Sequence, residues 1–253
     1  MKKTAKKTTF TLLALGLASA LAVIAVAATD GYTAVSGKLS RKLPIYSVET
    51  QEKKIALTFD AAWGVEYTDE ILDILKAENV PATFFLVQFW AEKYPEYVKK
   101  IDQDGHAVGT HSAVHGHMSK MSAAVIEKDL KASAQAISSI TGKPVTLFRP
   151  PYGEYNDLVI GEAEKAGLYS VQWDVDTLDW KNLTAKEMEE RVLTKAQNGS
   201  IVLCHNNGLH TAEFLPGVIK KLKEKGFTFV RVDDLIYKEN YEIDVTGRQR
   251  FVG

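Results

Sequence analysis

Residues 54–87 read KIALTFDAAWGVEYTDEILDILKAENVPATFFLV, and this stretch indicates how the chain folds. A short apolar run at 55–59 ends on Asp60, an amphipathic segment follows at 68–78, and a second apolar run occupies 82–87. The aliphatic residues of the amphipathic segment share one face, and Pro81 lies just past its end. Strand, helix and strand at this spacing predict two parallel strands joined by a right-handed helical crossover.

The same alternation continues toward the C-terminus. Further apolar runs lie at 107–110, 145–148, 169–173, 201–204 and 228–230, and amphipathic segments lie at 91–103, 123–139, 156–166, 185–197 and 213–224. Together with the first two, this makes seven predicted strands. The pattern predicts a closed or nearly closed (β/α) barrel, with an open doubly wound sheet as the alternative.

Polar side chains follow directly after five of these apolar runs. They are Asp60, His111, Arg149, Asp174 and His205. The carboxyl ends of the strands in such a fold meet at one edge, where the loops are free to vary. We therefore expect these five side chains to converge on one site.

The first 29 residues differ from the rest of the chain. Four lysines within the first seven residues precede an uncharged apolar run at 10–28. A helix of that length rises about 28 Å, close to the thickness of a bilayer, which predicts a membrane anchor. The small residues at 25–27 also fit a cleaved signal peptide, and a buried core helix is a third interpretation. Anchor and signal peptide both place the rest of the chain outside the cytoplasm, either held at the membrane or secreted.

Residues 30–52 are predicted to form a linker that ends in a lead-in strand at 44–48, and the polar tail at 238–253 is expected to fray. The formal net charge is −1 and the only charges before Asp30 are lysines, so the remainder is acidic and nucleic acid is excluded as a partner. The single cysteine, Cys204, excludes an intrachain disulfide and a multi-cysteine zinc site. No feature indicates which proteins, if any, bind the chain.

His111 and His115 lie four positions apart, a spacing that lets two imidazoles bind one metal ion from a tight loop. Solvated or capping histidines are the alternative, but the position directly after a strand favours the metal site. His106 precedes its strand and is predicted to be structural, and His117 is predicted to be a solvated loop residue.

Residues 148–153 read FRPPYG and predict an irregular turn, because two prolines fix φ and Gly153 permits positive φ. Such a turn can direct a main-chain N–H toward an oxyanion. Residues 176–180, DTLDW, offer carboxylates that can hold Arg149 and an indole, Trp180, against which a sugar ring can lie. A rigid connection and a surface turn are the alternatives for the two segments.

Five segments resemble, in order, the motifs of the polysaccharide deacetylases with a NodB-like domain, carbohydrate esterase family 4: residues 58–60, 111–115, 149–153, 176–180 and 203–205. The similarity is greatest to the anchored sporulation-type and peptidoglycan deacetylases of Gram-positive bacteria. It implies a distorted (β/α) barrel of seven or eight strands over residues 53–237, preceded by one apolar helix. It also implies hydrolysis of N-acetyl groups from a cell-wall glycan.

The resemblance assigns a chemical role to each motif. Asp60 would be the general base that takes a proton from water, and His205 would protonate the departing amine. His111 and His115 would bind a divalent metal ion, expected to be zinc. A main-chain N–H near Tyr152 would stabilise the oxyanion.

Four further residues would support this chemistry. Arg149 would orient Asp60, and Asp179 would hold either Arg149 or His205. Trp180 and Leu203 would form walls of the acetyl pocket.

One position departs from the family pattern. The first motif usually reads Asp-Asp, the second Asp being a metal ligand, but this chain has Ala61 there. Zinc should then bind weakly, because catalytic zinc sites normally have three protein ligands. Asp60, His117, another carboxylate or water could occupy the third position.

Two functions from different classes follow. The first is a metal-dependent de-N-acetylase, and the alternative is a non-catalytic glycan-binding or morphogenetic protein whose metal site has degraded at Ala61. A glycosidase is disfavoured, since its paired carboxylates leave no role for three histidines.

Overall fold

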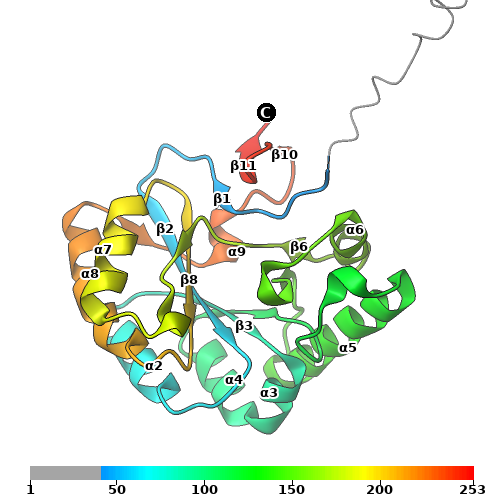
Figure 1. The fold of residues 1–253 in the computed structure, drawn as a ribbon, viewed down its shortest axis with the longest axis horizontal. Helices are drawn as coiled ribbons and strands as arrows, with labels where there is room; N and C mark the ends of the chain where they lie inside the picture. Colours follow the sequence, from blue (N-terminus) through cyan, green and yellow to red (C-terminus); the bar gives the residue numbers. More distant parts are fainter. Residues whose placement is uncertain (1–40) are drawn as a thin grey trace, which may run out of the picture. The chain divides into compact units, whose positions relative to one another are not determined.

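The seven strands predicted from the sequence all belong to one sheet: β2 (Lys54–Ala61), β3 (Thr83–Leu86), β4 (Ala107–Thr110), β5 (Leu147–Phe148), β6 (Tyr169–Ser170), β8 (Ser200–His205) and β9 (Thr228–Phe229). The structure is a computed structural model that describes residues 41–253 (Figure 1). Strands β2 to β6 pair in parallel in sequence order, and β8 and β9 pair in parallel with β2. These are the parallel pairings that the crossover pattern predicted.

The lead-in strand closes the sheet on itself. β1 (Ser47–Val48) pairs antiparallel with β8 through Ser47 and Ser200. Just before it, Ile45 donates its N–H to Ser170 O at 2.8 Å and accepts the N–H of Gln172 at 2.7 Å, so it bridges to the end of β6. The lead-in segment thus connects the two ends of the parallel run, and the predicted distorted barrel is confirmed.

The C-terminal tail is ordered, so the expected fraying was wrong. β10 (Tyr241–Ile243) and β11 (Arg248–Phe251) form an antiparallel hairpin, and β11 runs parallel to β1. Gln249 explains the order: its buried side chain accepts the N–H of Tyr237 at 2.9 Å and donates to Tyr237 O at 2.7 Å. A polar sequence conceals this, because the anchoring contacts are hydrogen bonds rather than apolar burial.

Helices cover the outside of the barrel: α2 (Thr68–Ala77), α3 (Gln88–Lys93), α4 (Pro95–Gln103), α5 (Ala123–Thr141), α6 (Asp157–Lys165), α7 (Ala185–Lys195), α8 (Thr211–Glu224) and α9 (Val232–Leu235) (Figure 1). The single helix predicted at 91–103 is two helices. Pro95 begins the second one, and Tyr94 before it has φ −129° and ψ 55°, outside the helical region. A residue preceding proline is disfavoured in helical geometry, which accounts for the break.

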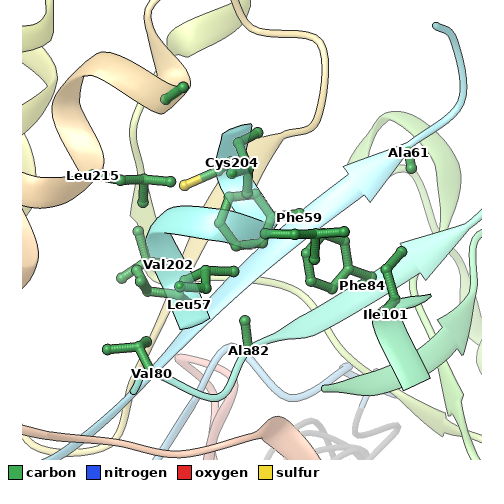
Figure 2. Close-up of a cluster of buried hydrophobic side chains, with 14 of the residues drawn as sticks. Leu57, Phe59, Ala61, Val80, Ala82, Phe84, Ile101, Val202, Cys204 and Leu215 are labelled. Atoms are coloured by element: carbon green, nitrogen blue, oxygen red, sulfur yellow. The ribbon is translucent and has the colours of Figure 1, made fainter. Parts of the chain in front are cut away.

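Alternation along β2 turns its side chains to opposite faces. Leu57, Phe59 and Ala61 belong to the hydrophobic cluster shared with α2 and α8, where Phe59 stacks on Phe84 (Figure 2). The residues between them, Thr58 and Asp60, face the barrel interior, as the period of two in a strand requires. The strand therefore positions Asp60 inward at its carboxyl end.

The segments predicted as anchor or signal peptide, residues 1–29, and most of the linker lie outside the described residues. Within residues 41–253 no helix is long and apolar enough to cross a membrane.

Candidate active site

Asp60 and Arg149 form a buried ion pair at the carboxyl ends of β2 and β5. Arg149 Nη1 lies 2.8 Å from Asp60 Oδ1 and 2.8 Å from Thr58 Oγ1, while Nη2 donates to Gln172 O at 3.0 Å. Burial by itself would raise the pKa of Asp60, but the charge of Arg149, aided by nearby histidines, holds that pKa below its ordinary value. Asp60 is therefore a carboxylate, and Arg149 orients it as predicted.

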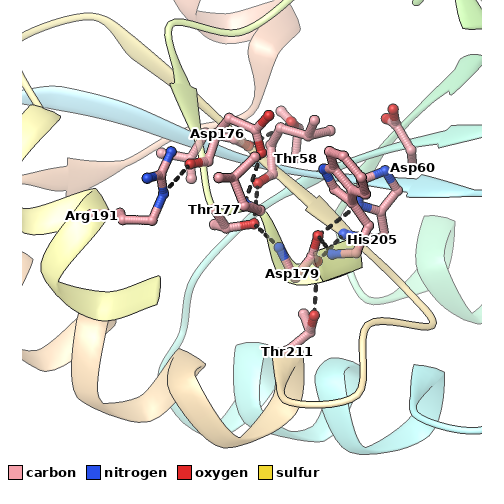
Figure 3. A network of polar contacts seen from close by, with 12 residues as sticks. Thr58, Asp60, Asp176, Thr177, Asp179, Arg191, His205 and Thr211 are labelled. Atoms are coloured by element: carbon pink, nitrogen blue, oxygen red, sulfur yellow. Dashed lines mark hydrogen bonds and ion pairs between the residues drawn. The ribbon is translucent and has the colours of Figure 1, made fainter. Parts of the chain in front are cut away.

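His205 lies beside Asp60, since the register of β2 with β8 pairs these two residues directly. His205 Nδ1 is 2.7 Å from Asp179 Oδ1, and Asp179 Oδ2 accepts the His205 N–H at 2.6 Å and the Thr211 hydroxyl at 2.8 Å (Figure 3). Burial would lower the pKa of His205, but the hydrogen bond and charge of Asp179 raise it above its ordinary value. Asp179 was predicted to hold either Arg149 or His205, and in the structure it contacts His205.

His111 follows β4 and has a defined tautomer. Its Nδ1 lies 2.7 Å from Arg149 O, and since a carbonyl only accepts, Nδ1 carries the hydrogen. The lone pair of Nε2 is then free, and this atom lies 3.6 Å from Asp60 Oδ2. A histidine that donates through one nitrogen to a backbone carbonyl is oriented as metal-binding histidines usually are.

His115 lies next to His111, with ring centroids 4.9 Å apart. The loop between them is tight: Ser112 has φ +74° and His115 has φ +53°. Ser112 Oγ accepts the His115 N–H at 2.9 Å, and Asp129 Oδ1, from α5, accepts the Ala113 N–H at 2.8 Å. Asp129, which sequence reasoning missed, therefore braces the loop that carries both histidines.

The residues present fit a divalent ion in part. His111 Nε2 and Asp60 Oδ2 lie 3.6 Å apart, too far for a hydrogen bond, and the buried Nδ1 of His115 has no hydrogen-bond partner among residues 41–253. A cation would satisfy such atoms, yet within residues 41–253 no three His, Cys, Asp or Glu side chains are gathered as a complete metal site. Ala61 is fully buried in the hydrophobic cluster and supplies no ligand.

His117 does not replace the missing ligand. It pairs with Glu154 at 2.9 Å and stacks on Tyr152, exposed to solvent as predicted. Asp60 is a carboxylate that lies beside His111 in the same pocket.

These side chains line a pocket of about 560 Å³. Its walls include the three residues predicted to contact substrate, Tyr152, Trp180 and Leu203. Tyr152 has φ +60° and Gly153 φ +68°, which is the irregular turn predicted for this segment. The full lining is Asp60, Ala62, Trp63, His111, His115, Tyr152, Gly153, Trp173, Asp176, Trp180, Leu203, His205 and Asn207.

Asp174 does not join this site, so the prediction of five converging residues was wrong in one member. Its carboxylate accepts the Ser200 hydroxyl and the Ile201 N–H, both at 2.8 Å, at the start of β8. The reason is an unpredicted strand, β7 (Val175–Asp176), which pairs with β8. Asp174 therefore precedes a strand rather than following one.

Comparison with known proteins identifies the family. The family model "Polysaccharide deacetylase" matches residues 47–171. A peptidoglycan-N-acetylglucosamine deacetylase of Bacillus cereus is 34% identical over 76% of this chain and 92% of that protein. The chain belongs to the polysaccharide deacetylase family. It is thereby a member of a family of hydrolases that act on carbon–nitrogen bonds outside peptides.

Other family members include both enzymes and a pseudoenzyme. The peptidoglycan-N-acetylmuramic acid deacetylase of Bacillus subtilis is 33% identical, and its structure has a TM-score of 0.72 over 76% of this chain and 84% of that one. A family 4 pseudoenzyme from Bacillus anthracis has a TM-score of 0.74 at 34% identity, over 82% of this chain and 72% of that chain. The chain spans only 44% of the peptidoglycan-N-acetylglucosamine deacetylase of Listeria monocytogenes and 60% of the Bacillus subtilis protein YlxY.

Proposed function

We propose that this polysaccharide deacetylase removes acetyl groups from N-acetylated amino sugars of peptidoglycan. The observation that carries the proposal is the pairing of Asp60 with His205 across β2 and β8, at one edge of one pocket. Asp60 has a lowered pKa and can accept a proton, whereas His205 has a raised pKa and can donate one. Hydrolysis of an amide needs both groups.

The reaction divides between these two residues. Asp60 takes a proton from the attacking water as the water oxygen bonds to the acetamide carbonyl carbon. His205 then protonates the nitrogen as the carbon–nitrogen bond breaks, leaving acetate and the free amine. Arg149 and Asp179 keep the two groups in their starting protonation states.

His111 and His115 are the residues that would hold a divalent metal, expected to be zinc, and Asp60 beside them acts as the base. When bound, such an ion lowers the pKa of water and polarises a carbonyl. The walls supplied by Trp180 and Leu203 suit the acetyl methyl group, and the turn at Tyr152 suits the oxyanion.

A non-catalytic glycan-binding protein is the second candidate, favoured by the buried Ala61 and by the existence of a pseudoenzyme in the family. Acetate release from peptidoglycan and chitooligosaccharides distinguishes the two. The purified full chain should release acetate, lose that activity in EDTA and regain it with Zn²⁺ or Co²⁺. His205→Gln should release none. Absence of acetate from the wild type under every condition would favour the second candidate.

We also propose that the protein acts outside the cytoplasm, held by residues 10–28 as an anchor or released after cleavage. Support comes from the apolar run and the lysines before it. Mass spectrometry of the mature protein, with membrane fractionation, tests this. A cytoplasmic, uncleaved and unbound protein would contradict it.

A further inference from the structure

We propose that Trp63 is a stacking platform for a second pyranose ring of the glycan, next to the unit that is deacetylated. For the identity of the ligand the inference rests on the proposed function. Trp63 lies three residues past Asp60, lines the same pocket, and leaves 56% of its surface exposed. Trp180, on a different loop of that pocket, is exposed to a similar extent, 58%.

The loop that carries Trp63 is rigidly held. The carbonyl of the next residue, Gly64, accepts a hydrogen bond from Trp90 Nε1 at 2.7 Å and another from Asn206 Nδ2 at 2.9 Å. Both donors belong to buried side chains, and Gly64 itself has φ +63°. The indole is therefore presented to solvent by an ordered backbone, so little entropy is lost when a ligand covers it.

The folded chain covers only part of the Trp63 indole. Trp63 meets the ring of His115 edge-on, with centroids 4.9 Å apart, and more than half of its surface is exposed in the described part of the chain. Large exposed aromatic side chains grouped in a pocket mark binding surfaces, and the C–H face of a pyranose is an apolar surface that can cover an indole.

The two tryptophans line the same pocket beside different residues of the site. Trp180 follows Asp179, which holds His205, and its main-chain N–H donates to that carboxylate at 2.9 Å. Trp63 instead contacts His115, on the side of the candidate metal ligands. A sugar whose acetamide lies between Asp60 and His205 covers Trp180, and the neighbouring unit of the chain reaches Trp63. On this proposal the site binds a polymer in preference to a single sugar.

The competing role for Trp63 is to position His115 alone. Such a role would affect all substrates alike, whereas a platform affects only those long enough to reach it. The test compares acetate release from the dimer and the pentamer of N-acetylglucosamine by wild type, Trp63→Ala and Trp63→Phe. Phe251→Ala removes an exposed aromatic ring from β11, outside the pocket, and serves as the matched control.

We expect the wild type to prefer the pentamer, and Trp63→Ala to reduce the ratio of kcat/KM for pentamer over dimer by roughly tenfold, equivalent to about 1.4 kcal/mol. Trp63→Phe should restore much of the ratio because it keeps a flat ring, and Phe251→Ala should leave it unchanged. A fall in kcat/KM that is equal for both lengths would overturn the inference while the proposed function stands.

Calorimetric titration of the pentamer into wild type and Trp63→Ala separates the two proposals. Binding that weakens in Trp63→Ala, without acetate release by either protein, would support the platform and contradict the enzyme. Equal binding by both proteins, or none by the wild type, would overturn the platform.

Discussion

One carboxylate, that of Asp179, fixes both the ring and the main chain of His205. Its Oδ1 lies 2.7 Å from His205 Nδ1 and its Oδ2 accepts the His205 N–H at 2.6 Å (Figure 3). The hydrogen on Nδ1 leaves Nε2 to carry the transferable proton into the pocket. Asp179 thus sets the orientation and the protonation of His205 together.

Asp179→Asn should therefore lower both the pKa of His205 and the rate of deacetylation. Because Asp179 raises that pKa, its loss should move the alkaline limb of the kcat profile to lower pH. We expect kcat to fall by roughly a hundredfold or more at neutral pH. Acetate release measured across pH tests this. Asp174→Asn, outside the pocket, is the control, and a limb that stays in place in Asp179→Asn would contradict the prediction.

Removing one partner of the Asp60–Arg149 ion pair should lower the free energy of unfolding. Arg149→Met leaves the buried carboxylate of Asp60 without its partner, and we expect a loss of about 3–5 kcal/mol in the free energy of unfolding. Adding Asp60→Asn removes the uncompensated charge and should recover part of that loss. Urea unfolding of the two variants measures the difference. A double variant that is less stable than Arg149→Met would be inconsistent with this account.

Asp129 should act on metal binding through the loop between His111 and His115. Asp129→Ala leaves the Ala113 N–H without its acceptor, so the affinity for Zn²⁺ should fall by about 10–100-fold. Asp129→Asn keeps an acceptor oxygen and should stay nearer to the wild type. Glu127→Ala changes an exposed carboxylate of the same helix and should have no effect. Calorimetric titration with Zn²⁺ gives the affinities; equal values for Asp129→Ala and Glu127→Ala would rule out the bracing role.

The sequence could reveal the residues at strand ends because two local patterns coincide there. An apolar run predicts a buried strand, and a polar side chain directly after it has no packing role to fill, so Asp60, His111, Arg149 and His205 could be found. The barrel followed from the regular spacing of the same runs. Both inferences use only neighbours along the chain.

The features that were missed depend on contacts between distant segments. Asp129 lies within an ordinary amphipathic helix, and only the folded chain brings its carboxylate to the His111 loop. β7 has two residues and no hydropathy pattern of its own, so the sequence placed Asp174 after a strand instead of before one. The C-terminal hairpin is anchored through Gln249, a residue whose burial no hydropathy pattern predicts.

His106 allows a pH prediction that is independent of catalysis. It is buried just before β4, and its Nδ1 accepts the Ala82 N–H at 3.1 Å, so the neutral ring is the form that fits. Burial lowers its pKa from 6.5 to about 4. The folded state therefore resists protonation that the unfolded chain accepts below about pH 6.5.

The stability of the folded state depends on pH because of this difference in pKa. The stabilisation is fully present above pH 6.5 and is lost as the pH falls toward 4, a change on the order of 3 kcal/mol in the free energy of unfolding. His106→Asn keeps an acceptor for the Ala82 N–H but cannot be protonated, so its stability should fall less steeply over this range. Denaturant unfolding at a series of pH values gives the two slopes, with His117→Asn as an exposed control. Parallel slopes for wild type and His106→Asn would show that another group controls the acid limb.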